Sequence, residues 1–337
     1  MNKKNAPSAP PIFIHSLFRS GSTYVFNVFR RAEHGYWCYQ EPEHELLKCL
    51  NEDPGYLLTI ADDSADTHRH PKLGKPYFWE LHEIRESLHG LFDKSISYDD
   101  FFITSPQKLP KAQLKYFSTL VENARGKAVL QCCRSFGRIS ALKETFGGVH
   151  IHLWREPRNQ WWSYKVTDYF DSAMQLIYNA SKLPAILGEV KSHCGLAEFH
   201  NVDISVEIEH ARRNPLPSQQ NYFAFYALWL YSYLECMQQS DADINIDRLS
   251  ADERYRAATL QRLSEQGVSG LDFSDCTLPH AVFSKKEEIF FSEIESRVIG
   301  LFLLTGYSKQ KLDGVLDAQA EVSGIVTPTT EELIKDS

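Results

Sequence analysis

The residues best suited to chemistry stand in segment 18–24, which reads Phe-Arg-Ser-Gly-Ser-Thr-Tyr. An apolar run precedes it and a helical pattern over 22–33 follows, so the segment predicts a turn between a strand and a helix. Backbone N–H groups and the helix dipole attract anions at such a helix start, and the Arg19 side chain would add a cation. The sequence therefore predicts a turn that binds a phosphate-like group through Arg19, Ser20, Gly21, Ser22 and Thr23.

A simpler interpretation of this turn is also open. Ser-Gly-Ser-Thr is a cluster of helix-capping residues of a kind that starts many helices. The ATP-binding loop Gly-x-x-x-x-Gly-Lys-Ser/Thr is absent, because the segment lacks the first glycine and has Arg19 in place of the lysine. A second motif is needed to distinguish an anion site from a simple cap.

That second motif follows the run 148–154, whose apolar and β-branched residues predict a buried parallel strand. Arg155 comes directly after the strand, and Pro157 suits the first turn of the next helix. Ligands of open α/β sheets bind at the carboxyl ends of strands. Arg155 and Ser163, eight residues further on, are therefore candidates to bind one phosphate. The alternative is an arginine that caps a strand end and a serine on a helix surface.

Together the two motifs resemble those of PAPS-dependent sulfotransferases, whose sulfuryl donor is 3′-phosphoadenosine 5′-phosphosulfate (PAPS). In that family a loop like this turn holds the 5′-phosphosulfate, and an arginine and a serine spaced like Arg155 and Ser163 hold the 3′-phosphate. The resemblance is close over residues 11–45 and 127–165, faint over 242–304 and absent elsewhere. It implies that PAPS is the donor, that PAP is the product and that no metal ion is required.

Sulfuryl transfer needs a cation on the leaving-group side and a base that takes the proton of the acceptor. Arg19 is the first cation. Arg134, which follows the predicted strand 127–132, is a candidate second one, although a structural salt bridge explains it equally well. The corresponding strand end of cytosolic animal sulfotransferases reads Lys-Thr-His and supplies the base. Here it reads Cys-Cys-Arg-Ser, so the base must come from elsewhere.

The segment after the first helix offers two candidate bases. Several sulfotransferase branches use a glutamate from this segment, and Pro42 would end the strand and leave Glu41 at its carboxyl end. Glu41 is therefore the first candidate, and His44, whose imidazole titrates near neutral pH, is the second. We expect Glu43 and Glu45 to be solvated acids at a helix start.

The resemblance also implies a C-terminal loop that closes over the donor. Residues 279–286 are the best candidate for it, and Lys285 and Lys286 are its cations. The acceptor pocket is expected in segments 46–110 and 171–240, in which no motif is recognisable. The identity of the acceptor therefore stays open: a small molecule, a carbohydrate or another compound with a hydroxyl or amine.

These residues require a scaffold that brings several strand ends together. Apolar runs alternate with helical patterns, which predicts an α/β fold: a P-loop-like three-layer sandwich whose mostly parallel central sheet is flanked by helices. The predicted strands cover residues 11–16, 36–41, 127–132, 149–154 and 243–247. Besides the mainly helical segment 171–240, the predicted helices cover residues 22–33, 138–145, 157–170, 251–266 and 286–304.

Length and composition fit one domain over residues 11–306, with a flexible N-terminus at 1–10 and a tail at 307–337. The formal charge of −8 argues against a nucleic-acid partner. The seven cysteines include no Cys-x-x-Cys pair, which is typical of a reducing cytoplasm. The N-terminus lacks the apolar core of a signal peptide, and the most apolar stretch, 222–237, is too short to span a membrane.

The predicted function is therefore sulfuryl transfer from PAPS in the cytoplasm, with a Glu or His base. One alternative is a P-loop kinase that uses ATP, although the sequence has no Gly-Lys-Ser/Thr loop and no aspartate suited to Mg²⁺ after a strand. Another is a nucleotide-binding protein without catalysis. No metal site is expected, because His68 and His70 lie in a polar segment that predicts a surface loop.

Overall fold

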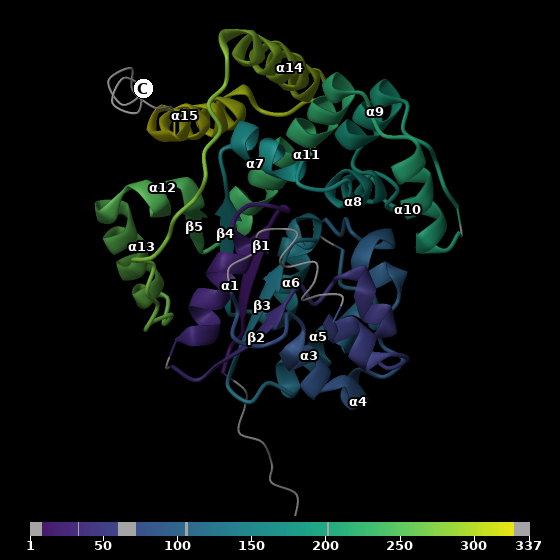
Figure 1. Cartoon of the computed structure of the whole chain (residues 1–337), viewed down its shortest axis with the longest axis vertical. Helices are drawn as coiled ribbons and strands as arrows, with labels where there is room; N and C mark the ends of the chain where they lie inside the picture. The colour runs from purple at the N-terminus through teal and green to yellow at the C-terminus, as the bar shows by residue number, and fades with distance from the viewer. Residues whose placement is uncertain (1–8, 33, 60–71, 105–106, 201, 327–337) are drawn as a thin grey trace, which may run out of the picture.

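The computed structural model describes residues 9–32, 34–59, 72–104, 107–200 and 202–326. Its centre is a five-stranded sheet in which every pairing is parallel. The strands follow one another across the sheet in the order β2 (Tyr36–Gln40), β3 (Lys127–Cys132), β1 (Ile12–Ser16), β4 (Val149–Trp154) and β5 (Ala242–Asn245). Helices cover both faces, so the predicted three-layer α/β fold is confirmed (Figure 1).

The two faces of the sheet carry different helices, because successive side chains of a strand point to opposite sides. Ile12 and Ile14 pack on one face, in a cluster with three helices. These are α1 (Ser22–Arg31), α12 (Ile246–Ala251) and α13 (Glu253–Glu265). Phe13 points to the other face. The helices in its cluster include α3 (Trp79–Glu83), α4 (Arg85–Leu88), α5 (Lys111–Glu122) and α6 (Ile139–Phe146).

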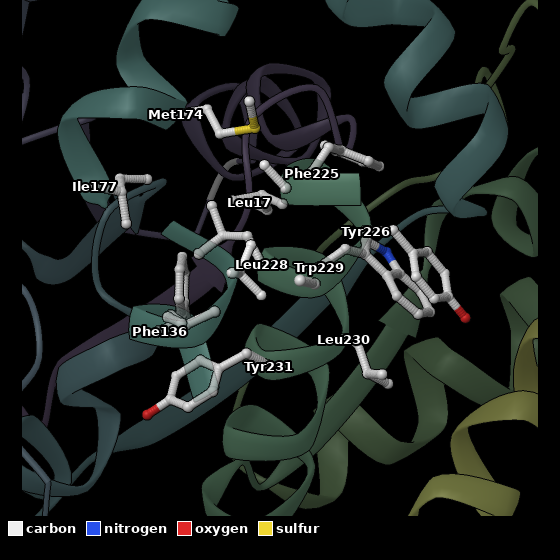
Figure 2. Packing of buried hydrophobic residues seen from close by; sticks show 14 of the residues in the cluster. Leu17, Phe136, Met174, Ile177, Phe225, Tyr226, Leu228, Trp229, Leu230 and Tyr231 are labelled. Carbon is white, nitrogen blue, oxygen red and sulfur yellow. The ribbon is translucent and has the colours of Figure 1, made fainter. Parts of the chain in front are cut away.

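The largest core cluster surrounds α11 (Ser218–Gln239), in which Trp229 is 1% exposed and Leu228 and Tyr231 are buried as well. Figure 2 shows these side chains together with Met174 and Ile177 of α8 (Tyr169–Ile177). A helix with apolar residues on all sides must be buried on all sides, and the apolar stretch of α11 is buried from Asn221 to Leu234. Its other neighbours are α7 (Pro157–Tyr164), α9 (Ala185–Cys194), α14 (Lys285–Leu304) and α15 (Lys309–Val326).

The remaining helices are short, apart from α10, which packs against α8. They are η1 (Glu45–Cys49), η2 (Ser95–Asp99), η3 (Phe136–Arg138) and α10 (Ile204–Arg213). Within the described ranges, no helix combines the length and the hydrophobicity needed to cross a bilayer.

The structure differs from the predicted elements in three places. The helix expected over 157–170 is two helices: α7 ends at Tyr164, and α8 begins at Tyr169, whose backbone N–H donates to the Thr167 hydroxyl. The last strand ends at Asn245, where α12 begins, two residues before the expected end. The expected tail is largely helix α15, which is buried at Leu312, Val315 and Val322.

Some predictions fall outside the described residues. These are the flexible N-terminus up to residue 8, the surface loop with His68 and His70, and the last part of the tail, 327–337.

Candidate active site

The carboxyl ends of the strands border one cavity of about 730 Å³. Three segments that are distant in the sequence line it: the turn after β1, the residues after β2 and the segment after β4. The predicted site residues in its wall are Arg19, Gly21, Ser22, Thr23, Glu41, His44, Arg155 and Ser163. The two others, Ser20 and Arg134, are buried behind it, with 1% and 0% of their surfaces exposed.

The turn after β1 is held in a backbone conformation that few residues adopt. Arg19 has φ 65° and Gly21 has φ 82°. A Cβ atom on Gly21 would lie 2.6 Å from Cγ1 of Ile246, which is too close. Only glycine therefore fits at position 21, and α12, which carries Ile246, presses the turn against the start of α1.

The start of α1 is open to an anion. Within the described part of the chain no side chain caps its N-terminus, and its first residues, Ser22 and Thr23, line the cavity. The Ser20 hydroxyl is buried and has no hydrogen-bond partner among the described residues. Since Ser20 does not line the cavity, the groups of the turn that face a ligand are the start of α1 and Arg19.

Arg19 joins the two sequence motifs. Its Nε donates a hydrogen bond of 2.9 Å to Oγ of Ser163 in α7, although 144 positions separate the residues. The guanidinium carbon also lies 5.2 Å from the ring centre of Phe170, a cation–π contact. The two motifs that the sequence predicts to bind anions are therefore in direct contact.

Arg155 is oriented by an acid that sequence reasoning missed. Asp247 accepts hydrogen bonds from Nε of Arg155, at 3.3 Å, and from the backbone N–H of Glu156, at 2.7 Å. Asp247 is fully buried at the start of α12, whereas the sequence placed it at the end of a strand. The carboxylate fixes the arginine at the end of β4 and offsets part of its charge, while the arginine still lines the cavity.

The C-terminal loop reaches the same place. The carbonyl oxygen of Pro279 accepts a hydrogen bond of 2.6 Å from an Nη atom of Arg155, and residues 277–279 line the cavity. Lys285 and Lys286 are exposed at the start of α14 and do not line it. Of the predicted loop, Pro279 therefore borders the site together with Thr277 and Leu278 before it, and the two lysines do not.

Glu41 lies at the end of β2 with φ 38°, in the left-handed region. Its Oε1 accepts a hydrogen bond of 2.6 Å from the Tyr77 hydroxyl, and its Oε2 accepts one of 2.8 Å from Arg134. Burial alone would raise the pKa of the Glu41 carboxyl, but the Arg134 guanidinium outweighs burial and holds this pKa below its usual value. Glu41 is therefore an ionised carboxylate whose oxygens keep lone pairs for a further donor.

Arg134 does not face the cavity as a second cation. Its guanidinium binds Glu41 and Glu45, each at 2.8 Å, and it receives no solvent. The ring centre of Phe18 lies 4.8 Å from its guanidinium carbon and separates it from the turn. Of the two interpretations that the sequence left open, Arg134 fits the structural salt bridge. It positions Glu41.

His44 is engaged at both ring nitrogens. Its Nδ1 accepts the backbone N–H of Leu46, at 3.2 Å, so the neutral ring carries its proton on Nε2. That nitrogen lies 3.3 Å from the Tyr169 hydroxyl. Burial lowers the pKa of His44, which keeps the ring neutral. In this tautomer no lone pair of the ring is left for the proton of an acceptor.

The expectation for Glu43 and Glu45 was wrong, since both are buried. Burial alone would raise the pKa of Glu45, but His44 and Arg134 bring it down to about 2. Burial raises the pKa of Glu43. The segment that looked like a solvated helix start is thus the inner wall of the cavity.

The residues that sequence reasoning missed are Tyr77, Tyr169, Glu45 and Asp247. Each acts through another side chain. Tyr77 binds Glu41, Tyr169 and Glu45 bind Arg134, and Asp247 binds Arg155. No motif marks them, because their partners come from distant segments of the chain.

A comparison of the chain with protein-family models gives no match, and a comparison with curated proteins gives none either. Within the described ranges, no group of three or more His, Cys, Asp or Glu side chains is placed to hold a metal ion. The function must therefore be argued from the geometry of the cavity.

Proposed function

We propose that this protein is a sulfotransferase that moves a sulfuryl group from PAPS to a hydroxyl or amine of an acceptor. One observation carries the proposal: a single cavity unites the anion-binding turn, Arg155 with Ser163, and the carboxylate Glu41. The reaction requires three parts: a site for the 5′-phosphosulfate, a site for the 3′-phosphate and a base. The cavity offers a candidate for each. The resemblance of segments 11–45 and 127–165 to sulfotransferases is independent support.

The residues present suit such a donor. The open start of α1, with Ser22 and Thr23, and Arg19 offer donors to a 5′-phosphosulfate. Arg155 and Ser163 offer donors to a 3′-phosphate. When bound, PAPS supplies the sulfuryl group and PAP as the leaving group, and this chemistry needs no metal ion.

In the proposed reaction the acceptor oxygen or nitrogen forms a bond to sulfur while the bond from sulfur to the 5′-phosphate oxygen breaks. Glu41 accepts the proton of the acceptor, and Arg19 stabilises the charge that develops on the leaving phosphate. The order of the strands supports this division of roles. Glu41 follows β2, at one edge of the sheet, and Arg155 follows β4, with the turn after β1 between them.

The proposal includes a cytoplasmic location. All seven cysteines are free thiols, and six of them are buried. Free thiols persist in a reducing compartment, whereas secreted proteins tend to pair them.

Thermal unfolding in the presence of PAP and of ATP tests the donor site. A ligand at a hundred times its Kd stabilises the folded state by about 2.7 kcal/mol, so PAP should raise the melting temperature clearly and ATP much less. Equal shifts would favour a kinase that uses ATP. A shift with PAP but no transfer from PAPS to any acceptor would favour a nucleotide-binding protein without catalysis.

A further inference from the structure

We infer that the acceptor is a phenol or a closely related hydroxyl compound with an apolar body, and not a carbohydrate. The inference rests on the proposed function, because it concerns the part of the same cavity that extends from Glu41 away from Arg155.

This part of the cavity has an apolar wall. It is formed by η1, by the start of α3, by the break between α7 and α8, and by α10. Ile204 and Ile208 lie one turn apart on α10 and both face the cavity. The apolar side chains opposite and beside them are Leu46, Phe78, Val166 and Phe170.

The polar groups beside Glu41 are already paired with one another. The Tyr169 hydroxyl donates to Oε1 of Glu45, at 2.7 Å, and receives a hydrogen bond from Arg134. His44 uses both ring nitrogens, as described above. A sugar would bring several hydroxyls into the space beside Glu41, where Tyr169 and His44 are already engaged, and a buried hydroxyl without a partner is unfavourable. An aromatic ring needs no such partners and gains from the ring contacts.

The chemistry of the base points to the same class. Arg134 holds the pKa of Glu41 below its usual value, so this carboxylate is a weak base. A phenol, with a pKa of about 10, gives up its proton more readily than an aliphatic alcohol does. An amine would be protonated at neutral pH and would have to lose a proton before it could attack.

The charges in the cavity wall do not select a charged acceptor. Lys48, Asp168 and Arg212 line the cavity, and none of the three has a side-chain ion pair with a described residue. Since they include both signs, they do not favour an acceptor of one particular charge.

The test is calorimetric titration of the PAP-bound protein with 2-naphthol and with methyl glucoside. We expect 2-naphthol to bind and the glucoside to show no heat of binding. Ile208→Asn should weaken 2-naphthol at least tenfold, because it places an amide in the apolar wall. Val206→Asn is the matched control: Val206 is 50% exposed on the same helix and does not line the cavity, so this variant should bind 2-naphthol as before.

A second variant at the same position tests the inference by a different physical effect. Ile208→Trp fills the same space without a buried amide, and it should also abolish 2-naphthol binding while the melting shift with PAP persists. Binding of the glucoside but not of 2-naphthol would overturn the inference, and so would unchanged 2-naphthol binding in both Ile208 variants.

The two proposals fail separately. If PAP binds and 2-naphthol does not, the acceptor inference is wrong and the donor site stands. If 2-naphthol binds to the protein and is displaced by Ile208→Trp while PAP does not bind, the apolar subsite is supported and the proposed function is wrong.

Discussion

Two described residues other than glycine adopt the left-handed backbone conformation, and both belong to the candidate active site. Among the described residues other than glycine, only Arg19 and Glu41 have positive φ, at 65° and 38°. Such conformations cost about 1–3 kcal/mol each and persist where the surroundings enforce them. Here the enforcing contacts are Ser163 for Arg19 and Arg134 with Tyr77 for Glu41. Strain at both ends of the cavity is consistent with residues that are held ready for a ligand.

Replacement of the base is the first prediction. Glu41→Gln should bind PAP normally and lose roughly two to four orders of magnitude in turnover, because the amide cannot accept the proton of the acceptor. Steady-state kinetics with PAPS measures the loss. His44→Asn should have a much smaller effect, because the tautomer of His44 leaves no free lone pair. Near-normal turnover of Glu41→Gln together with an inactive His44→Asn would reverse the two roles.

The next prediction concerns Arg155, which is proposed to bind the 3′-phosphate of the donor. Arg155→Ala should weaken PAP binding by about 2–5 kcal/mol, because the arginine is 3% exposed and lines the cavity. Some loss of stability is also expected, since the buried Asp247 loses its arginine partner and keeps the backbone N–H of Glu156. Arg158→Ala is the matched control: Arg158 pairs with Glu295 and does not line the cavity. Equal PAP affinities of the two folded variants, measured by calorimetry, would exclude Arg155 from the donor site.

At the scale of elements, the junction of β1 and α1 decides whether the donor can be held. Gly21 stands at this junction, with φ 82° and with Ile246 of α12 against it. The turn, the first turn of α1 and the start of α12 are therefore packed as one unit around the candidate phosphate position.

Gly21→Ala tests this unit. The added Cβ would lie 2.6 Å from Ile246, so both stability and PAP affinity should fall. Gly35→Ala is the control, because Gly35 has φ 71° but has no atom within 4 Å of an added Cβ. It should lose only about 1–2 kcal/mol of stability from backbone strain and should keep its PAP affinity. A loss of PAP affinity in Gly35→Ala as large as in Gly21→Ala would show that strain alone, not the site, is responsible.

The strands could be predicted from the sequence because buried parallel strands are continuous apolar runs, as at 149–154. The ends of strands then placed Arg19, Glu41 and Arg155 at one edge of the sheet. The break between α7 and α8 was missed, because no proline or glycine marks it in the sequence. Asp247 was missed for a different reason: its importance comes only from its contact with Arg155, 92 positions away.

At the scale of the molecule, a chain of hydrogen bonds runs through the buried sheet. The carbonyl of Gly147, His150, His15 and Ser135 follow one another at 3.0, 2.9 and 2.6 Å. Burial lowers the pKa of His15 well below its usual value and that of His150 to about 4. Both rings are therefore neutral in the folded protein under conditions in which they are protonated in the unfolded chain.

This difference predicts a loss of stability in acid. Between pH 6.5 and pH 4 the unfolded state binds more protons at these histidines, so the free energy of unfolding falls as the pH is lowered. The contribution of His150 between pH 7 and pH 5 is about 2 kcal/mol. Raised carboxyl pKa values, such as that of Glu43, act in the opposite direction. The effect is therefore measured as the difference between the wild type and His150→Asn in urea unfolding at both pH values.

His150→Asn should reduce the pH dependence of stability by that amount. The same slope in the variant and in the wild type would show that the buried histidines do not control acid stability.

The central claim is sulfuryl transfer, and the most direct measurement is transfer of labelled sulfur from PAPS to an acceptor panel that includes 2-naphthol. The account predicts labelled sulfate ester and free PAP in equal amounts with the wild-type protein, and strongly reduced product with Glu41→Gln. No labelled product with any acceptor, from folded protein that binds PAP, would contradict it.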